Sequence, residues 1–121
     1  MAQDLLLDID ITNGRELVEA LKAGGMDVRG AYWLYVTDIE QWKLQVVTGE
    51  ASEGSTALYA KALKVSRDFD FLGRVQFVSP SSAVFQGLSG LGEIGVKGRR
   101  VSRSVFNGVY VDDAFVYPMA A

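Results

Sequence analysis

The 121-residue chain contains no cysteine and no histidine. The lack of cysteine rules out disulfides and thiolate nucleophiles, and the lack of histidine rules out imidazole zinc ligands and Ser-His-Asp triads. Any general base must be a carboxylate, a lysine or a tyrosine. Any metal site must be built from oxygen ligands, which favours Mg²⁺, Mn²⁺ or Ca²⁺. From the residues alone we predict no metal site and no cofactor.

Long apolar runs are missing as well. No stretch approaches the roughly 20 apolar residues that a membrane-spanning helix needs, and the N-terminal MAQDLLLDID is acidic where a secretory signal is cationic. We therefore expect a soluble cytoplasmic protein that does not bind membranes. The formal net charge of −3 also argues against nucleic acid as a partner, because polyanions attract basic surfaces.

The residues that are present suit one folded domain. Hydrophobic residues make up 49% of the sequence and charged residues 22%, which are ordinary proportions for a globular protein. A chain of 121 residues can bury one hydrophobic core but is too short for a second. We therefore expect a single domain over residues 1–121.

The first predicted helix is bounded by two local signals. Asn13 precedes Glu16 by three residues, which is the spacing of a capping box. Gly24 and Gly25 end the helix where a left-handed residue is needed. The preceding segment 4–11 alternates like a strand in one register and fits a helix in another, and we favour the helix.

Two further helices are predicted downstream. Residues 55–65 have helical apolar spacing, with Ser55 as the cap. Pro80 ends a strand, and Ser81 or Ser82 can cap a short helix that follows it.

Strands are predicted around these helices. Residues 31–48 form two strands joined by a loop at 38–41, and RVQFVS, residues 74–79, alternates like a single strand. Asn107-Gly108 is a strong hairpin signal, because both residues tolerate the positive φ of a type I′ turn. The expected fold is α+β, with an about five-stranded, largely antiparallel or mixed sheet built from two hairpins plus one strand, and two to three helices packed on it.

The hairpin over residues 31–48 has two apolar faces. The face around Trp33 is predicted to meet the core. The other face carries Tyr32, Leu34 and Val36 and is too apolar to be left in water. A helix or a second subunit should cover it. We predict it as the interaction surface of a homodimer, or of a complex with another protein.

One motif suggests catalysis. A Gly-Ser pair, Gly54 and Ser55, followed by the DFDF segment, resembles the nucleotidyltransferase signature, in which a Gly-Ser turn opens a helix and a D-x-D strand follows. The resemblance implies that Asp68 and Asp70 share Mg²⁺ on one face of that strand. A third carboxylate is usual in that family, and it would come from Asp112 or Asp113.

The motif also departs from the family pattern. Glu53 stands where the family has an apolar residue. The helix between the two parts of the motif is longer and more apolar than the Arg-containing turn that is usual in the family. D-x-D or D-x-E recurs at residues 8–10 and 38–40, so the pattern has low specificity here. The alternative is that Asp68 and Asp70 lie in a solvated connection.

The adjacent Asp112 and Asp113 have a structural interpretation too. A two-residue turn at Asn107-Gly108 places Arg103 opposite Asp112, so the two charges support the hairpin. Asp113 then breaks the apolar alternation, as a residue at a bulge does. We favour this interpretation over a catalytic pair.

A basic run supplies Lys97, Arg99 and Arg103. On an extended chain these three point to one side and predict a site for phosphate or an acidic partner. The same charges would protect a solvated edge strand, and we favour that interpretation. The nearby GLGEIG, residues 90–95, matches a dinucleotide-binding pattern, but a helix is predicted before it and a strand after it, so we predict a loop.

The order GRELVEALKAGGMDVRGAYWLYV…EQWKLQVVT…VQFVSPSSAVFQGL…NGVYVDDAFVY resembles a family of small, uncharacterised bacterial proteins. The resemblance runs over most of the chain and implies an α+β fold with no assigned activity. Together with the apolar hairpin face, it leads us to expect a non-catalytic homo-oligomerising or partner-binding protein. A divalent-metal-dependent nucleotidyltransferase-like enzyme is the alternative.

Overall fold

The computed structural model describes residues 6–51, 54–66, 68–90 and 97–118. Most of the GLGEIG motif, at 91–95, lies outside these residues. The described elements are, in chain order, α1 (Asp8–Ala23), β1 (Val28–Val36), the 3₁₀ turn η1 (Thr37–Ile39), β2 (Gln41–Thr48), α2 (Ser55–Val65), α3 (Phe69–Leu72), β3 (Val75–Val78), α4 (Ala83–Ser89), β4 (Arg99–Phe106) and β5 (Val109–Val116). None of the described helices is long and apolar enough to cross a membrane.

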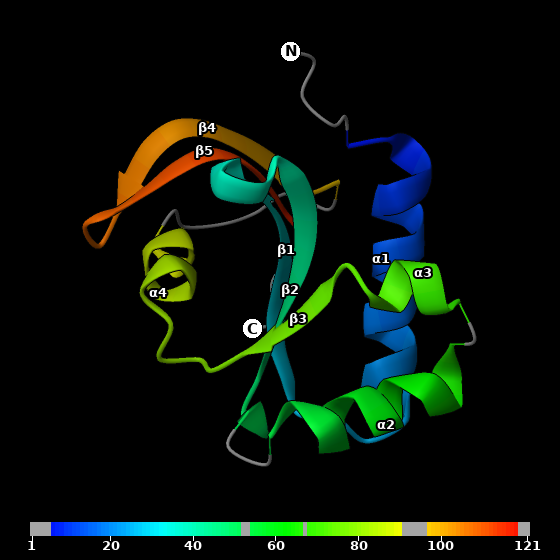
Figure 1. Cartoon of the computed structure of the whole chain (residues 1–121). Coiled ribbons are helices and arrows are strands. Elements are labelled where there is room, and N and C mark those ends of the chain that lie inside the picture. The colour runs from blue at the N-terminus through cyan, green and yellow to red at the C-terminus, as the bar shows by residue number, and fades with distance from the viewer. Residues whose placement is uncertain (1–5, 52–53, 67, 91–96, 119–121) are drawn as a thin grey trace.

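The fold is α+β, as the sequence predicts, with a five-stranded mixed sheet in the order β3-β2-β1-β5-β4 (Figure 1). The β1–β2 hairpin pairs Trp33 with Leu44 and Tyr35 with Trp42, which confirms the predicted faces. β3 joins the outer edge of β2 in parallel. The β4–β5 hairpin turns at Asn107-Gly108, where φ is +49° and +79°, so the predicted type of turn is confirmed.

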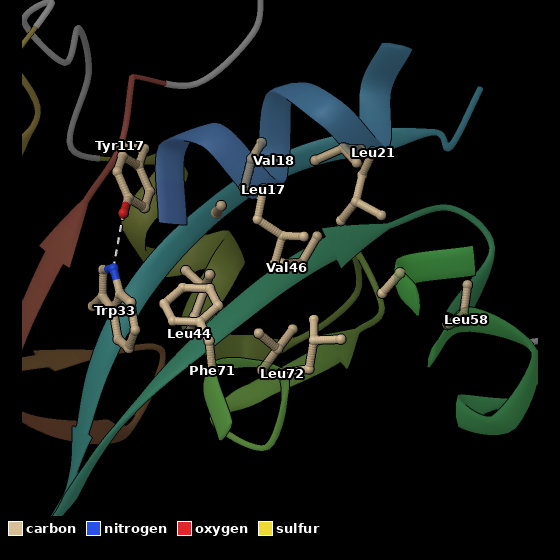
Figure 2. Close-up of a cluster of buried hydrophobic side chains, with 14 of the residues drawn as sticks. Leu17, Val18, Leu21, Trp33, Leu44, Val46, Leu58, Phe71, Leu72 and Tyr117 are labelled. Carbon is tan, nitrogen blue, oxygen red and sulfur yellow. Dashed lines mark hydrogen bonds between the residues drawn. The ribbon is translucent and has the colours of Figure 1, made fainter. Parts of the chain in front are cut away.

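Helices cover both faces of the sheet (Figure 1). Helices α1, α2 and α3 contribute to the larger core, in which Leu17 and Leu21 of α1 pack toward Leu44 and Val46 of β2 (Figure 2). On the opposite face, Leu88 of α4 belongs to a second cluster of buried side chains. That cluster contains Tyr32, Val47, Leu88 and Val116.

Helix α1 begins earlier than predicted. It starts at Asp8, and Asn13 lies inside it rather than at its cap. The carboxylate of Asp10 accepts a hydrogen bond from the backbone N–H of Leu7 at 3.0 Å and so satisfies one of the free donors of the first turn. Asp10 also forms a 2.9 Å ion pair with Arg74, a residue distant in sequence. The helical alternative for the end of segment 4–11 is therefore confirmed from Asp8 onward.

The other helix boundaries follow the local signals closely. Gly25 has φ of +97° just after α1, as its predicted left-handed role requires. Gly54, with φ of +92°, is the residue that caps α2, and Ser55 is the first helical residue instead of the cap. Ser82 precedes α4 at the predicted place. Within the described residues, four helices pack on the sheet rather than two or three, because residues 69–72 add the single turn α3.

Candidate functional site

The β4–β5 hairpin bends away from the rest of the sheet. β5 pairs with β1 only over Ala114–Val116. Val101 and Phe106 of β4 stand an odd number of positions apart and should point to opposite faces of a regular strand, yet both pack into the cluster under α4. The strand must switch faces between them, and Arg103, with φ of +48°, lies in that interval. The bend carries the hairpin tip toward α4 (Figure 1).

Two contacts hold the bent hairpin on α4. The side-chain amide of Asn107 donates a hydrogen bond to the carbonyl oxygen of Ala83 at 3.2 Å. Gly87 faces Phe106 so closely that a Cβ at position 87 would lie 2.3 Å from the Phe106 Cβ. Only a residue without a side chain allows this approach. No local sequence signal could have revealed it, because the contact joins a helix to a distant strand.

A groove of about 240 Å³ opens where β1 and β5 separate. It is shared by the end of β1, the η1 turn, the start of α4 and the hairpin tip. The described residues that line it are Leu34, Tyr35, Val36, Thr37, Asp38, Val84, Val109, Tyr110, Val111 and Asp112. Aliphatic and aromatic side chains dominate this lining, and the acidic groups of Asp38 and Asp112 are its charged members.

The three predicted interaction residues have different environments. Leu34 and Val36 are half-buried and line the groove. Tyr32 is fully buried beneath α4 and so cannot contact a second subunit. The structure therefore corrects the prediction at Tyr32, because a helix of the same chain covers this part of the apolar face. The groove residues of α4 and β5 were missed, since they come from segments far away in sequence.

The Tyr32 hydroxyl is unusual within the second cluster. It is buried, and it forms no hydrogen bond with any of the described residues. Burial raises the pKa of Tyr32 to about 12, and the nearby Ser82 side chain lowers it only in part. The Ser82 side chain does not form a hydrogen bond with the Tyr32 hydroxyl. A buried polar group in this state costs roughly 1–3 kcal/mol of stability.

Tyr32→Phe is therefore expected to leave stability unchanged or to raise it by about 1 kcal/mol, because it removes a desolvated hydroxyl that gains no bond. Urea unfolding measures the effect. Tyr117→Phe is the matched control, since the Tyr117 hydroxyl accepts from Trp33 Nε1 at 2.8 Å and donates to the Ile11 carbonyl at 2.7 Å. The free energy of unfolding of this control should fall by about 1–2 kcal/mol. A comparable loss in Tyr32→Phe would show that its hydroxyl is bonded in solution.

Of the two adjacent carboxylates in β5, Asp113 forms hydrogen bonds across the β4–β5 hairpin. Arg100 binds Asp113 through two hydrogen bonds of 2.7 Å, and the Ser102 hydroxyl donates a third at 3.2 Å. Burial alone would raise the pKa of Asp113, but the Arg100 hydrogen bonds and charge outweigh it and lower that pKa. Arg103, the expected partner of Asp112, lies at the bend instead of in a regular strand. The predicted register is confirmed at the three pairs nearest the turn.

The carboxylates of the nucleotidyltransferase hypothesis do not come together. Asp68 caps α3, since its Oδ1 accepts from the backbone N–H of Phe71 at 3.0 Å, and Asp70 lies within α3. The expected D-x-D strand is therefore wrong, because this segment forms a helical turn that places Phe71 and Leu72 in the core. Asp68 lines a crevice of about 330 Å³ beside α1, whereas Asp112 lines the groove. Among the described residues, no acidic cluster is placed to hold a metal ion.

The three basic residues are exposed: Lys97 precedes edge strand β4, Arg99 begins it and Arg103 lies in its middle. The predicted anion site required an extended chain that directs all three to one side. Gly98 has φ of +85° and Arg103 has φ of +48°, so the backbone between them is not uniformly extended. Their position on an edge strand agrees with the alternative, in which charge protects the edge from pairing with other chains.

No protein-family model, curated protein or solved structure matches this chain. The resemblance to small bacterial proteins therefore stays an expectation.

Proposed function

We propose that the protein is a non-catalytic binding module that holds a protein partner, or a second copy of itself, in the groove between β1 and β5. The observation that carries the proposal is the apolar character of this accessible region. Val105, Val109 and Tyr110 at the hairpin tip are 64%, 37% and 60% exposed. Exposed apolar side chains gathered beside a groove are typical of interaction surfaces.

The composition of the groove supports binding more than catalysis. Its polar side chains, apart from the two tyrosines, are those of Thr37, Asp38 and Asp112. A reaction needs groups arranged around a reacting atom, whereas a binding surface needs apolar area with a polar rim. The nucleotidyltransferase alternative requires Asp68 and Asp70 on one strand face, and no observation favours it over binding.

Leu34→Glu tests the proposal. A charge at this half-buried position should leave the chain folded but abolish binding through the groove, because it places a carboxylate on the apolar wall. If the wild type is a dimer in light scattering, the variant should have the 13.2 kDa mass of the monomer. Val65→Glu, a charge added on an exposed part of α2, is the matched control and should leave the mass unchanged.

Two results would count against the proposal. A Leu34→Glu chain that does not fold would place Leu34 in the core. A dimer that survives both Leu34→Glu and Tyr110→Ser would place the interface elsewhere. A monomeric wild type directs the search to a different chain as the partner.

A further inference from the structure

We infer that the occupant of the groove is an extended segment of another protein that carries an aliphatic side chain flanked by lysine or arginine. This inference rests on the proposed function and names the class of partner. It is carried by the charge of the groove and by the way in which the two strands separate.

The charge of the groove is of one sign. Among the ten described lining residues, Asp38 and Asp112 are acidic and none is basic. No hydrogen bond or ion pair joins the Asp38 side chain to another described residue. Asp112 already has an interaction of its own, so Asp38 contributes the larger unbalanced charge. A cationic side chain at this rim would find a complementary field.

The same charges disfavour a second copy as the occupant. A two-fold contact through the groove would bring Asp38 and Asp112 of one molecule against Asp38 and Asp112 of the other. Like charges held close together in a partly desolvated interface repel each other. A different chain can instead present basic residues at these positions.

The strand geometry favours an extended occupant. The register between β1 and β5 ends at Leu34 and Ala114, and beyond that point the two strands separate around the groove. Extended peptides commonly bind beside strand edges, with alternate side chains entering apolar pockets. The groove volume of about 240 Å³ is below the range of roughly 300–1,000 Å³ that is usual for small-molecule sites. It suits one or two side chains of a longer segment.

The experiment uses the full chain and two synthetic peptides, acetyl-Lys-Val-Lys-Val-Lys-amide and its counterpart with glutamate in place of lysine. Amide NMR signals are followed during titration to millimolar peptide, where weak binding is measurable. The basic peptide should shift the signals of Leu34, Val36 and Val109, and the acidic peptide should not. Asp38→Asn/Asp112→Asn should weaken binding about fivefold, because exposed ion pairs contribute modestly.

Glu16→Gln/Glu19→Gln is the charge-matched control on the exposed side of α1 and should bind like the wild type. If Asp38→Asn/Asp112→Asn does not fold, the single variant Asp38→Asn is titrated in its place. Equal binding of both peptides, or groove signals that do not respond to the basic peptide, would overturn the inference. A dimer that Leu34→Glu dissociates would overturn it while supporting the proposed function. If the groove binds neither peptide and the protein is a dimer that Leu34→Glu does not dissociate, both the inference and the proposed function are wrong.

Discussion

Replacing Gly14 by alanine is expected to lower the free energy of unfolding by about 2–3 kcal/mol, although alanine normally stabilises a helix interior by up to about 1 kcal/mol relative to glycine. Gly14 is buried within α1. A Cβ at this position would lie 2.3 Å from the Tyr117 hydroxyl oxygen and 3.1 Å from Trp33 Nε1. Tyr117 cannot yield freely, because its hydroxyl accepts a hydrogen bond from Trp33 (Figure 2) and donates another to the Ile11 carbonyl.

Urea unfolding of Gly14→Ala measures this loss. Gly24→Ala at the end of α1 is the control, since its added Cβ would make only ordinary contacts of 3.4 Å or more, and its stability should change little. The double variant Gly14→Ala/Tyr117→Phe removes the clashing hydroxyl and should cost less than the sum of the two single changes. A Gly14→Ala protein more stable than the wild type would contradict the close packing of α1 on Tyr117.

Raising the pH from 10 to 12 is expected to remove about 4 kcal/mol of stability through two buried tyrosines. Burial raises the pKa of Tyr32 and of Tyr117 to about 12, against about 10 in an unfolded chain. Because each raised pKa belongs to the folded state, the stabilisation is complete below pH 10. It is lost as the pH rises through 12, when the unfolded chain ionises more readily.

Stability measured by urea unfolding at several pH values tests this dependence. Lysine side chains also titrate in this range, so the single variants Tyr32→Phe and Tyr117→Phe isolate the tyrosine contribution. Each variant should lack about half of the alkaline loss, whatever its stability at pH 7. Variants that lose stability as steeply as the wild type would show that neither tyrosine is shielded from water in the folded state.

Asp113 acts at the opposite end of the pH scale. Its pKa is lowered in the folded chain, so the stabilisation from its bonds with Arg100 is present above pH 4 and declines as the pH falls through the folded-state pKa. Both side chains are partly exposed, which keeps this contribution small. The pair fastens β4 to β5 just before the bend that forms the groove.

Only part of the candidate site could be predicted from the sequence. Leu34 and Val36 follow from the alternation of the first hairpin, because an apolar second face requires a cover. Val84, Val109 and Tyr110 could not be assigned to the same groove, since nothing local places the second hairpin beside α4. The bend that brings them there depends on Gly87 meeting Phe106 and on the left-handed backbone at Arg103.

The elements that depend on near neighbours follow from the amino-acid sequence. Alternating side chains set the faces of β1 and β2, the Asn107-Gly108 pair set the second turn, and Gly25 ended α1, because strand alternation and positive φ are properties of a few adjacent residues. The start of α1, the burial of Tyr32 and the partner of Asp113 could not be predicted in this way. Each depends on contacts between elements, whose stabilising energy is present only once distant segments have packed together.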